Sequence, residues 1–246
     1  MARLVLLLRL LRVGVHLASG LLQCALLFPF LAPGARNALV QRWSRGMMRV
    51  FRIRVIASGP GQGAAAGAVV ANHVSWIDVF VLNAIGPCRF IAKSEVRRWP
   101  AIGWLSARAG TIYVARGMRA GLTAANATIA AHLAAGERLA FFPEGTSRPQ
   151  GSLLPFHANL FQGVIAAGAA VHPVAVRYLA ADGELSAAAE YIGDMSLWTS
   201  IVNLLAHGPF IAQVAQLTPI SSSGLDRRGL AALAHAAIET SLARRD

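Results

Sequence analysis

The stretch AVVANHVSWIDVFVL, residues 68–82, predicts the type of fold that the chain adopts. Its first part, residues 68–71, is a short apolar run of the kind that forms a buried strand. Its last part, residues 77–82, is predicted to be a helix. Between them lies a polar segment that contains His73 and Asp78. A strand that leads into a helix is the repeating unit of an α/β protein, so the same alternation is expected elsewhere in the chain.

The alternation continues through most of the sequence. Further strands are predicted at residues 89–92, 111–114, 139–142, 171–177 and 209–216. Further helices are predicted at about residues 119–135, 156–167 and 225–244. The small, flexible stretch 58–67 is predicted as a turn. Together these segments indicate an α/β fold with a mixed, largely parallel central sheet flanked by helices.

The first 55 residues are predicted to attach the protein to a membrane. Residues 13–32 carry no formally charged side chain. A helix of about 20 residues reaches roughly 30 Å, the thickness of the hydrocarbon core of a bilayer. Residues 37–51 mix apolar side chains with arginines, which is typical of an amphipathic helix on an anionic lipid surface. We therefore predict an N-terminal apolar membrane-anchoring helical segment at residues 1–55 and an α/β domain at residues 56–246.

Several properties of this anchor stay open in the sequence. Pro29 and Pro33 can break the helix, so a segment that enters one leaflet and returns fits as well as a full span. A cleaved signal peptide fits less well, because Arg9 and Arg12 interrupt the apolar run. Arginines on both flanks leave the orientation ambiguous. The stretch 37–51 could also be a basic helix packed on its own domain.

The overall composition agrees with contact with lipid. The chain is 55% hydrophobic and 14% charged, whereas an ordinary soluble domain carries about 25% charged residues. Its net charge is +12, which suits anionic lipid headgroups or nucleic acid. The basic residues lie beside apolar runs rather than in a separate basic stripe, so we expect membrane lipids as partners and not nucleic acid. Cys24 and Cys88 lack the spacing of a zinc site, and no metal is expected.

Three polar clusters follow predicted strands, at the carboxyl ends where open α/β sheets carry their sites. In the first, NHVSWID at residues 72–78, His73 could take the proton from a hydroxyl as that hydroxyl attacks a thioester. Asp78 could fix the tautomer of the ring and stabilise the imidazolium. The alternative is structural, because Ser75 and Asp78 have the pattern of a capping box and His73 would then be an ordinary loop residue. The two interpretations are compatible.

The other two clusters contain candidate binding residues. In FFPEGTSRPQG, residues 141–151, a predicted strand leads into a tight loop. Its backbone N–H groups, with Thr146 and Arg148, could hold a phosphate or another polar headgroup, or it could be a turn with solvated charges. In GTIYVARG, residues 110–117, Arg116 follows a strand. It could bind an anionic headgroup or be an ordinary surface arginine.

These clusters occur in one order, and together they resemble the motifs of the glycerolipid (lysophospholipid) acyltransferase family, which includes the 1-acyl-sn-glycerol-3-phosphate acyltransferases. Four motifs of that family are matched, at residues 72–78, 110–116, 142–146 and 171–174. The resemblance implies that His73 is the catalytic base and that Asp78 orients it. It also implies a set of residues that bind the acceptor headgroup: Arg116, Glu144, Gly145, Thr146 and Arg148.

The resemblance further implies a reaction and a place for it. A fatty acyl chain would move from acyl-CoA or acyl carrier protein to the free hydroxyl of a lysophospholipid, in the first instance 1-acyl-sn-glycerol-3-phosphate, to give phosphatidic acid. No bound cofactor is implied. The expected location is the inner (cytoplasmic) membrane, with the catalytic domain on the cytoplasmic side.

One departure from the family pattern keeps other substrates and functions open. The family commonly has E-G-T-R-S, whereas this chain has EGTSR at residues 144–148, so the arginine associated with phosphate binding is displaced by one position. An acyltransferase of lyso-ornithine lipid, whose headgroup is an amino acid, is therefore an alternative. A non-catalytic lipid-binding protein with the same fold is a more distant one. A hydrolase fits less well, because the sequence contains no Gly-x-Ser-x-Gly elbow.

Overall fold

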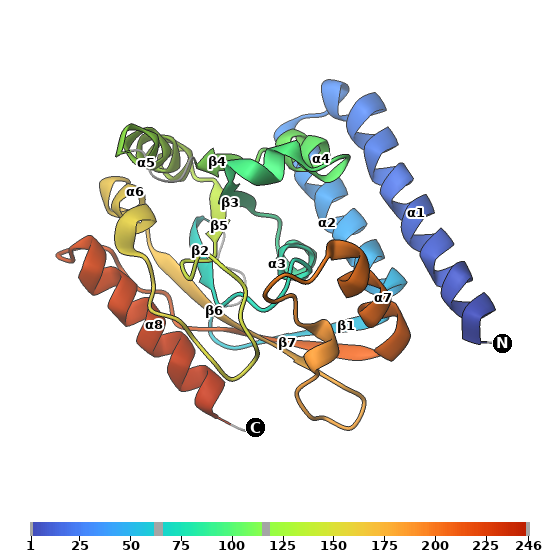
Figure 1. Cartoon of the computed structure of the whole chain (residues 1–246). Coiled ribbons are helices and arrows are strands. Elements are labelled where there is room, and N and C mark those ends of the chain that lie inside the picture. The colour runs from blue at the N-terminus through green and yellow to red at the C-terminus, as the bar shows by residue number, and fades with distance from the viewer. Residues whose placement is uncertain (1, 62–65, 115–118, 245–246) are drawn as a thin grey trace.

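Seven strands form the central sheet in the computed structural model, which describes residues 2–61, 66–114 and 119–244 (Figure 1). The strands are β1 (Ile53–Ser58), β2 (Gly67–Ala71), β3 (Arg89–Lys93), β4 (Ile112–Val114), β5 (Arg138–Phe141), β6 (Val171–Leu179) and β7 (Phe210–Gln216). Their order across the sheet is β1-β7-β6-β2-β5-β3-β4. Every pairing is parallel except that of β6 with β7. The sheet is thus mixed and largely parallel, and this prediction is confirmed.

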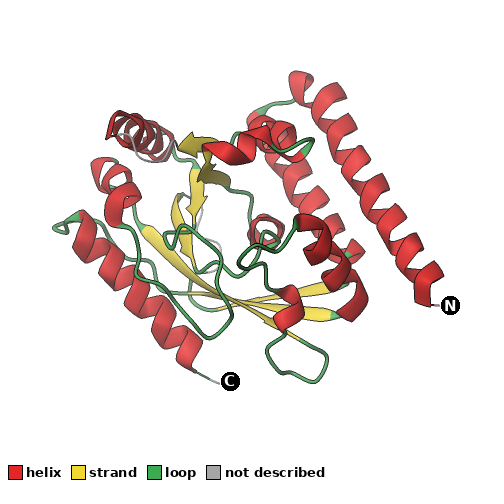
Figure 2. Cartoon of the chain, viewed as in Figure 1, coloured by secondary structure: helices red, strands yellow, loops and turns green. Residues whose placement is uncertain are grey.

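Helices cover both faces of this sheet (Figure 2). They are α1 (Ala2–Leu26), α2 (Pro33–Val50), α3 (Asp78–Ile85), α4 (Ile102–Arg108), α5 (Arg119–Ala134), α6 (Phe161–Ala166), α7 (Leu197–His207) and α8 (Arg227–Ala243). Side chains of α2, α3 and α7 join the core on one face, and those of α5, α6 and α8 join the core on the other. α1 forms an outer layer beside α2 at one edge of the molecule (Figure 1).

The central strand β2 is apolar throughout because it is buried on both sides. Val69 and Ala71 belong to the core under α2 and α3. Ala68 and Val70 belong to the core under α5 and α8. A parallel strand covered on two faces needs apolar side chains at every position, which explains the continuous run in the sequence.

The predicted elements form close to their expected positions, with a few differences. All six predicted strands are present, with ends shifted by one or two residues. β1, α4 and α7 were not predicted, and the 3₁₀ turn Phe28–Phe30 interrupts the apolar N-terminal run. The helix expected at residues 156–167 begins only at Phe161. It is preceded by a 3₁₀ turn at Ala158–Leu160. The backbone before that turn is not helical, because the N–H groups of Leu154 and His157 are bonded to Glu144 and to the carbonyl of Pro143.

The N-terminal segment forms the helix pair α1 and α2. α1 begins at Ala2, so it also contains the arginines that precede the uncharged run. Residues 3–30 are long and apolar enough to cross a membrane, by length and composition, and little of their most apolar part is buried in the protein. Pro33 begins α2, where a proline is tolerated because the first helical N–H groups need no partner within the helix. This exposed apolar helix suggests association with a membrane.

α1 is fixed to α2 by a reciprocal contact of two rings. His16 stacks on Trp43, with 4.9 Å between ring centroids. Trp43 Nε1 donates to the carbonyl of His16 at 3.0 Å, and His16 Nε2 lies 2.9 Å from the carbonyl of Trp43. The core beneath them includes Val13, Met47 and Ile53. The boundary expected between residues 55 and 56 therefore falls inside β1, and both parts contribute to one core.

Candidate active site

The polar segment after β2 begins where that strand separates from β6. The two strands pair in parallel as far as Ala71 and Val174. Beyond this point, the side chain of Asn72 takes the place of the backbone hydrogen bonds between the strands. Its Nδ2 donates to the carbonyl of Val176 at 3.0 Å, and its Oδ1 accepts the N–H of Val176 at 2.7 Å. The loop is thus tied to β6 while its backbone turns toward α3. β2 lies between β5 and β6, so the loop emerges at the carboxyl ends of three parallel strands, where open α/β sheets form sites.

The structure brings His73 and Asp78 into direct contact. His73 Nδ1 lies 2.8 Å from Asp78 Oδ2. The same oxygen accepts the backbone N–H groups of Val74 at 2.8 Å and Ser75 at 2.9 Å. Asp78 is the first residue of α3 and is completely buried. A buried carboxylate requires such donors, because burial without them would be costly.

Only half of the expected capping box forms. The Asp78 carboxylate reaches back to the N–H of Ser75, as a capping box requires. However, α3 begins at Asp78 with Ile77 as its N-cap, and the Ser75 hydroxyl has no hydrogen-bond partner in the described part of the chain. Asp78 therefore organises the loop that carries His73, besides contacting the ring.

The His73 ring is held on three sides and keeps one nitrogen for chemistry. It stacks on Phe142, with 4.1 Å between ring centroids and 13° between planes. The backbone N–H of His73 donates to Glu144 Oε1 at 2.8 Å, and the backbone carbonyl of His73 accepts the N–H of Arg148 at 2.8 Å. The side chain is 21% exposed. With Nδ1–H donated to Asp78, Nε2 carries the lone pair and can accept a proton.

Glu144 faces the interior and supports the backbone of the His73 loop. It is 3% exposed. Oε1 accepts the N–H of His73, and Oε2 accepts the N–H of Leu154 at 3.0 Å. Burial raises the pKa of the Glu144 carboxyl, and these two N–H bonds oppose the rise. Its contacts are those of a residue that fixes the loop.

The other residues expected to bind a headgroup follow Glu144 in the same tight turn. Gly145 donates its N–H to Phe142 at 3.1 Å and has a φ of +69°, which favours glycine. Thr146 and Arg148 have exposed side chains. Because the backbone of Arg148 is bonded to His73, both side chains lie on the segment that adjoins the imidazole.

Two positions bear on the recognition of a phosphate. Ser147 occupies the position where the family commonly has arginine, and its hydroxyl donates to the carbonyl of Tyr191. The arginine of this chain stands one residue later and is exposed. Arg116 lies outside the described residues, so its expected role in headgroup binding stays a prediction.

Two residues that the sequence analysis did not single out also contact the site. The Tyr178 hydroxyl donates to Asp78 Oδ1 at 2.6 Å. Gln150 bonds to both backbone groups of Tyr178, accepting its N–H at 2.7 Å and donating to its carbonyl at 3.0 Å. Tyr178 lies 100 positions from Asp78 and sits in an apolar strand. No local pattern therefore connects these residues to the motif.

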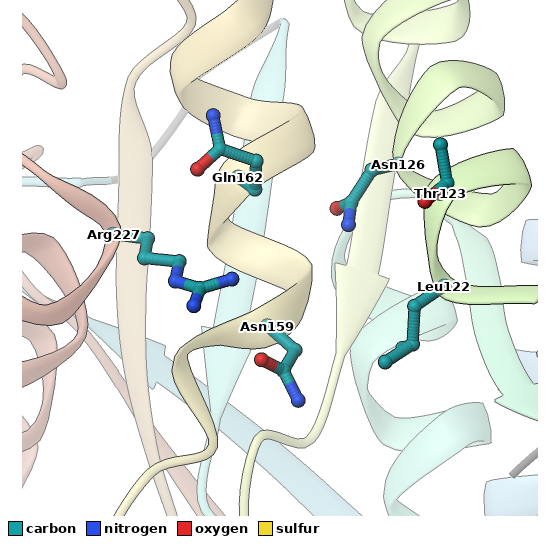
Figure 3. A pocket seen from close by; sticks show the side chains of 6 residues that line it. All are labelled: Leu122, Thr123, Asn126, Asn159, Gln162 and Arg227. Carbon is teal, nitrogen blue, oxygen red and sulfur yellow. The ribbon is translucent and has the colours of Figure 1, made fainter. Parts of the chain in front are cut away.

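Two cavities in the described part of the chain are lined by residues other than those around His73. A cavity of about 460 Å³ lies between α5, α6 and the start of α8 (Figure 3). Its lining residues are Leu122, Thr123, Asn126, Asn159, Gln162 and Arg227. A second, of about 340 Å³, lies beside α8 near Phe156 and His235. The described residues contain no group of three or more His, Cys, Asp or Glu side chains that could hold a metal ion.

Comparison with known proteins finds a family and relatives by sequence and a solved structure with a similar fold. Residues 56–177 match the family model described as acyltransferase. The chain is 38% identical over 217 residues to the lyso-ornithine lipid O-acyltransferase of Pseudomonas aeruginosa, covering 85% of this chain and 82% of the relative. It is 36% identical over 175 residues to the 1-acyl-sn-glycerol-3-phosphate acyltransferase of Neisseria meningitidis, covering 71% and 68%. The crystal structure of the 1-acyl-sn-glycerophosphate acyltransferase PlsC from Thermotoga maritima has the same fold, with a TM-score of 0.73 over 100% of both chains at 19% identity.

The matched region contains the loop of His73 and Asp78, the turn of Glu144 and the first part of β6. The alignments with the two relatives extend beyond this region and cover most of the chain. The resemblance inferred from four short motifs is thereby confirmed. The chain is an acyltransferase and belongs to the glycerolipid (lysophospholipid) acyltransferase family.

Proposed function

We propose that the protein moves a fatty acyl chain from acyl-CoA or acyl carrier protein to the free hydroxyl of a membrane lysolipid, with His73 as general base. The observation that carries this proposal is the 2.8 Å contact between His73 Nδ1 and Asp78 Oδ2 at the carboxyl end of β2. It leaves Nε2 as the basic nitrogen. A base of this kind lowers the barrier for attack by an alcohol, which is a weak nucleophile at neutral pH.

The proposed reaction proceeds in two steps. His73 Nε2 accepts the hydroxyl proton of the lysolipid as its oxygen attacks the carbonyl carbon of the thioester. The carbonyl electrons move onto oxygen and give a tetrahedral intermediate. When the carbonyl re-forms, the carbon–sulfur bond breaks and the thiolate leaves with the proton from the His73 imidazolium. Asp78 stabilises this imidazolium and keeps the proton of Nδ1 in place.

For the acceptor we favour lyso-ornithine lipid. The relative that is 38% identical, and of which the alignment covers 82%, carries that name. Ser147 turns its hydroxyl to Tyr191, so this position offers no guanidinium to a phosphate. The exposed guanidinium of Arg148 can instead pair with the carboxylate of an amino-acid headgroup. 1-Acyl-sn-glycerol-3-phosphate is the second candidate, favoured by the Neisseria meningitidis relative.

We further propose that α1 and α2 hold the enzyme on the cytoplasmic face of the inner membrane. α1 and the turn after it expose a set of large apolar side chains: Leu4, Val5, Leu7, Leu8, Leu11, Val15, Leu22, Leu26, Leu27 and Phe30. The following helix α2 is rich in arginine, which suits anionic headgroups. Both proposed acyl donors are cytoplasmic molecules, so the catalytic domain must face the cytoplasm.

A single series of assays tests the base and the acceptor. Purified wild type, His73→Ala and His207→Ala are assayed with acyl-CoA and either lyso-ornithine lipid or lysophosphatidate. We expect His73→Ala to lower kcat by about 100-fold to 10,000-fold with little change in the acceptor KM. His207 is exposed and bonded only to its own helix among the described contacts, so its variant serves as the control. Near-normal turnover by His73→Ala would contradict the assignment of His73 as base. A higher kcat/KM with lysophosphatidate than with lyso-ornithine lipid would make lysophosphatidate the preferred acceptor.

A further inference from the structure

Tyr178 places a buried hydroxyl on the oxygen of Asp78 that does not contact His73. It lies near the end of β6 and is completely buried. Its hydroxyl donates to Asp78 Oδ1 at 2.6 Å. Oδ2 is already occupied by the His73 ring and by two backbone N–H groups. The carboxylate is thus held by four donors, of which the phenol is the one that lies 100 positions away in the sequence.

The phenol of Tyr178 stays protonated and acts as a hydrogen-bond donor throughout the physiological pH range. Burial, together with the neighbouring Asp78 carboxylate, raises the pKa of Tyr178 well above its ordinary value. A protonated phenol can only donate to an ionised carboxylate, because that carboxylate carries no hydrogen. Asp78 is bonded to the side chains of His73 and Tyr178, and its charge also acts through space on Glu144.

The backbone of Tyr178 is fixed, so its hydroxyl defines one position for Oδ1. Its N–H and carbonyl are both bonded to Gln150. The same carbonyl also accepts the N–H of Ser186 at 2.9 Å. On its other side, β6 pairs with β7, where Tyr178 lies opposite Ala212. The donor therefore cannot follow the carboxylate if the carboxylate rotates.

We propose that Tyr178 is a positioning residue of the acyl-transfer reaction, which acts through Asp78 to orient His73 and to set how strongly the carboxylate attracts the imidazolium. This inference rests on the proposed role of His73 as base. A donor on Oδ1 restricts rotation about the carboxylate, so that Oδ2 stays opposite Nδ1. It also withdraws part of the negative charge that would otherwise act on the ring. Such an indirect partner tunes a catalytic group without touching substrate.

The test uses Tyr178→Phe, which keeps the ring and removes only the hydroxyl. We expect kcat to fall about ten-fold, because a hydrogen bond to a charged group is lost, while KM for donor and acceptor stays within about two-fold. The carboxylate without its phenol attracts the imidazolium more strongly. The acidic limb of the pH profile of kcat/KM should therefore move to higher pH, by about 0.5 to 1 pH unit.

Two further variants separate positioning from structure. In the Asp78→Ala background, Tyr178→Phe should change kcat by less than about two-fold, because the residue through which it acts is gone. Asn83→Ala removes another buried hydrogen bond of α3, that to the N–H of Cys88, without touching Asp78. The Asn83→Ala variant should be less stable than the wild type, and its pH profile of kcat/KM should be unchanged.

The possible results are distinct. A Tyr178→Phe profile that does not move to higher pH, or a loss of kcat that persists in the Asp78→Ala background, overturns the inference. His73→Ala is assayed beside these variants. If His73→Ala retains turnover, the proposed base fails, whereas if it is inactive and Tyr178→Phe behaves as wild type, only the role of Tyr178 fails.

Discussion

The two buried carboxylates of the site differ in function because their oxygens have different donors. Asp78 is bonded to an imidazole and a phenol, as well as to two backbone N–H groups. Glu144 is bonded to backbone N–H groups alone among the described contacts. Asp78 can therefore respond to the charge of His73 during the reaction. Glu144 instead determines where the backbone of His73 lies.

A Glu144→Gln variant tests this division of roles. The substitution keeps the shape but turns one NH₂ group toward a backbone N–H, of His73 or of Leu154, so that two donors face each other. We expect the free energy of unfolding to fall by about 1–3 kcal/mol and kcat to fall with it. Denaturant unfolding and steady-state assays measure the two effects. Glu239→Gln, at a 65% exposed side chain, should change neither.

The free energy of unfolding of the Glu144→Gln variant should depend on pH differently from that of the wild type. Burial raises the pKa of Glu144 in the folded protein above its unfolded value. The ionised carboxylate therefore costs stability at neutral pH, and this cost is relieved as the pH falls through the folded pKa. Glutamine does not titrate. The stability deficit of Glu144→Gln relative to wild type should thus be larger at about pH 5 than at about pH 7.5, and a deficit that shrinks on acidification would contradict it.

At this scale the sequence predicts those residues whose chemistry shows in a local pattern. His73 and Asp78 are five positions apart, and the structure brings their side chains together. The side chain of Glu144 turns inward, where the backbone N–H groups of His73 and Leu154 lie, which no local pattern predicted. Its expected role at a headgroup stays a prediction. Tyr178 carries no local signal, since an apolar strand with one tyrosine is typical of any core.

At the scale of elements, α1 and α2 pack closely through small residues. The stacked pair of His16 and Trp43 lies between the helices. A Cβ atom added at Gly20 would lie 2.7 Å from the Trp43 ring, and one at Gly46 would lie 2.5 Å from His16. Neither ring is free to move away, because each is hydrogen-bonded to the carbonyl of the other residue. The glycines therefore set the separation of the two helices.

A Gly46→Ala variant should loosen this helix pair. Alanine normally stabilises the interior of a helix by about 1 kcal/mol relative to glycine. Here the overlap with His16 should outweigh that gain and lower the thermal stability of the detergent-solubilised protein. Gly14→Ala, where a Cβ meets nothing within 4 Å, should show the gain without the overlap. Equal stability changes in the two variants would show that the helices do not depend on this contact.

Strand β1 was not predicted because it lacks a distinctive pattern. β1 is an edge strand that pairs only with β7 in the described sheet, and its burial alternates. It lies between a helix and a small-residue turn, so the short sequence IRVIAS was overlooked. The central strands were found because burial on both faces demands continuous apolar runs. Long-range pairing, which places β6 beside β2, leaves no mark on either strand alone.

At the scale of the whole molecule, the exposed apolar side chains are concentrated at one edge. Most of the large ones lie on α1 and on the turn after it. α8, which covers the other face of the sheet, lies at the opposite edge of the molecule (Figure 1). A lipid surface that covers α1 would leave α8 in water. The sequence predicted contact with lipid in residues 1–55, and the packing of α1 on α2 shows which side chains of this segment are exposed.

This distribution predicts which surface charges impair membrane binding. Leu7 and Leu11 are 62% and 63% exposed and lie four residues apart on α1, so they share one face. Replacing both by glutamate removes apolar area worth roughly 1.5–3 kcal/mol per side chain if buried in lipid, and adds charges repelled by anionic headgroups. We expect co-sedimentation with vesicles that contain phosphatidylglycerol to fall more than about ten-fold. The charge-matched control, Leu185→Glu with Leu233→Glu, changes two side chains that are each 47% exposed and lie outside α1. Equal losses in the two variants would mean that net charge, and not α1, determines binding.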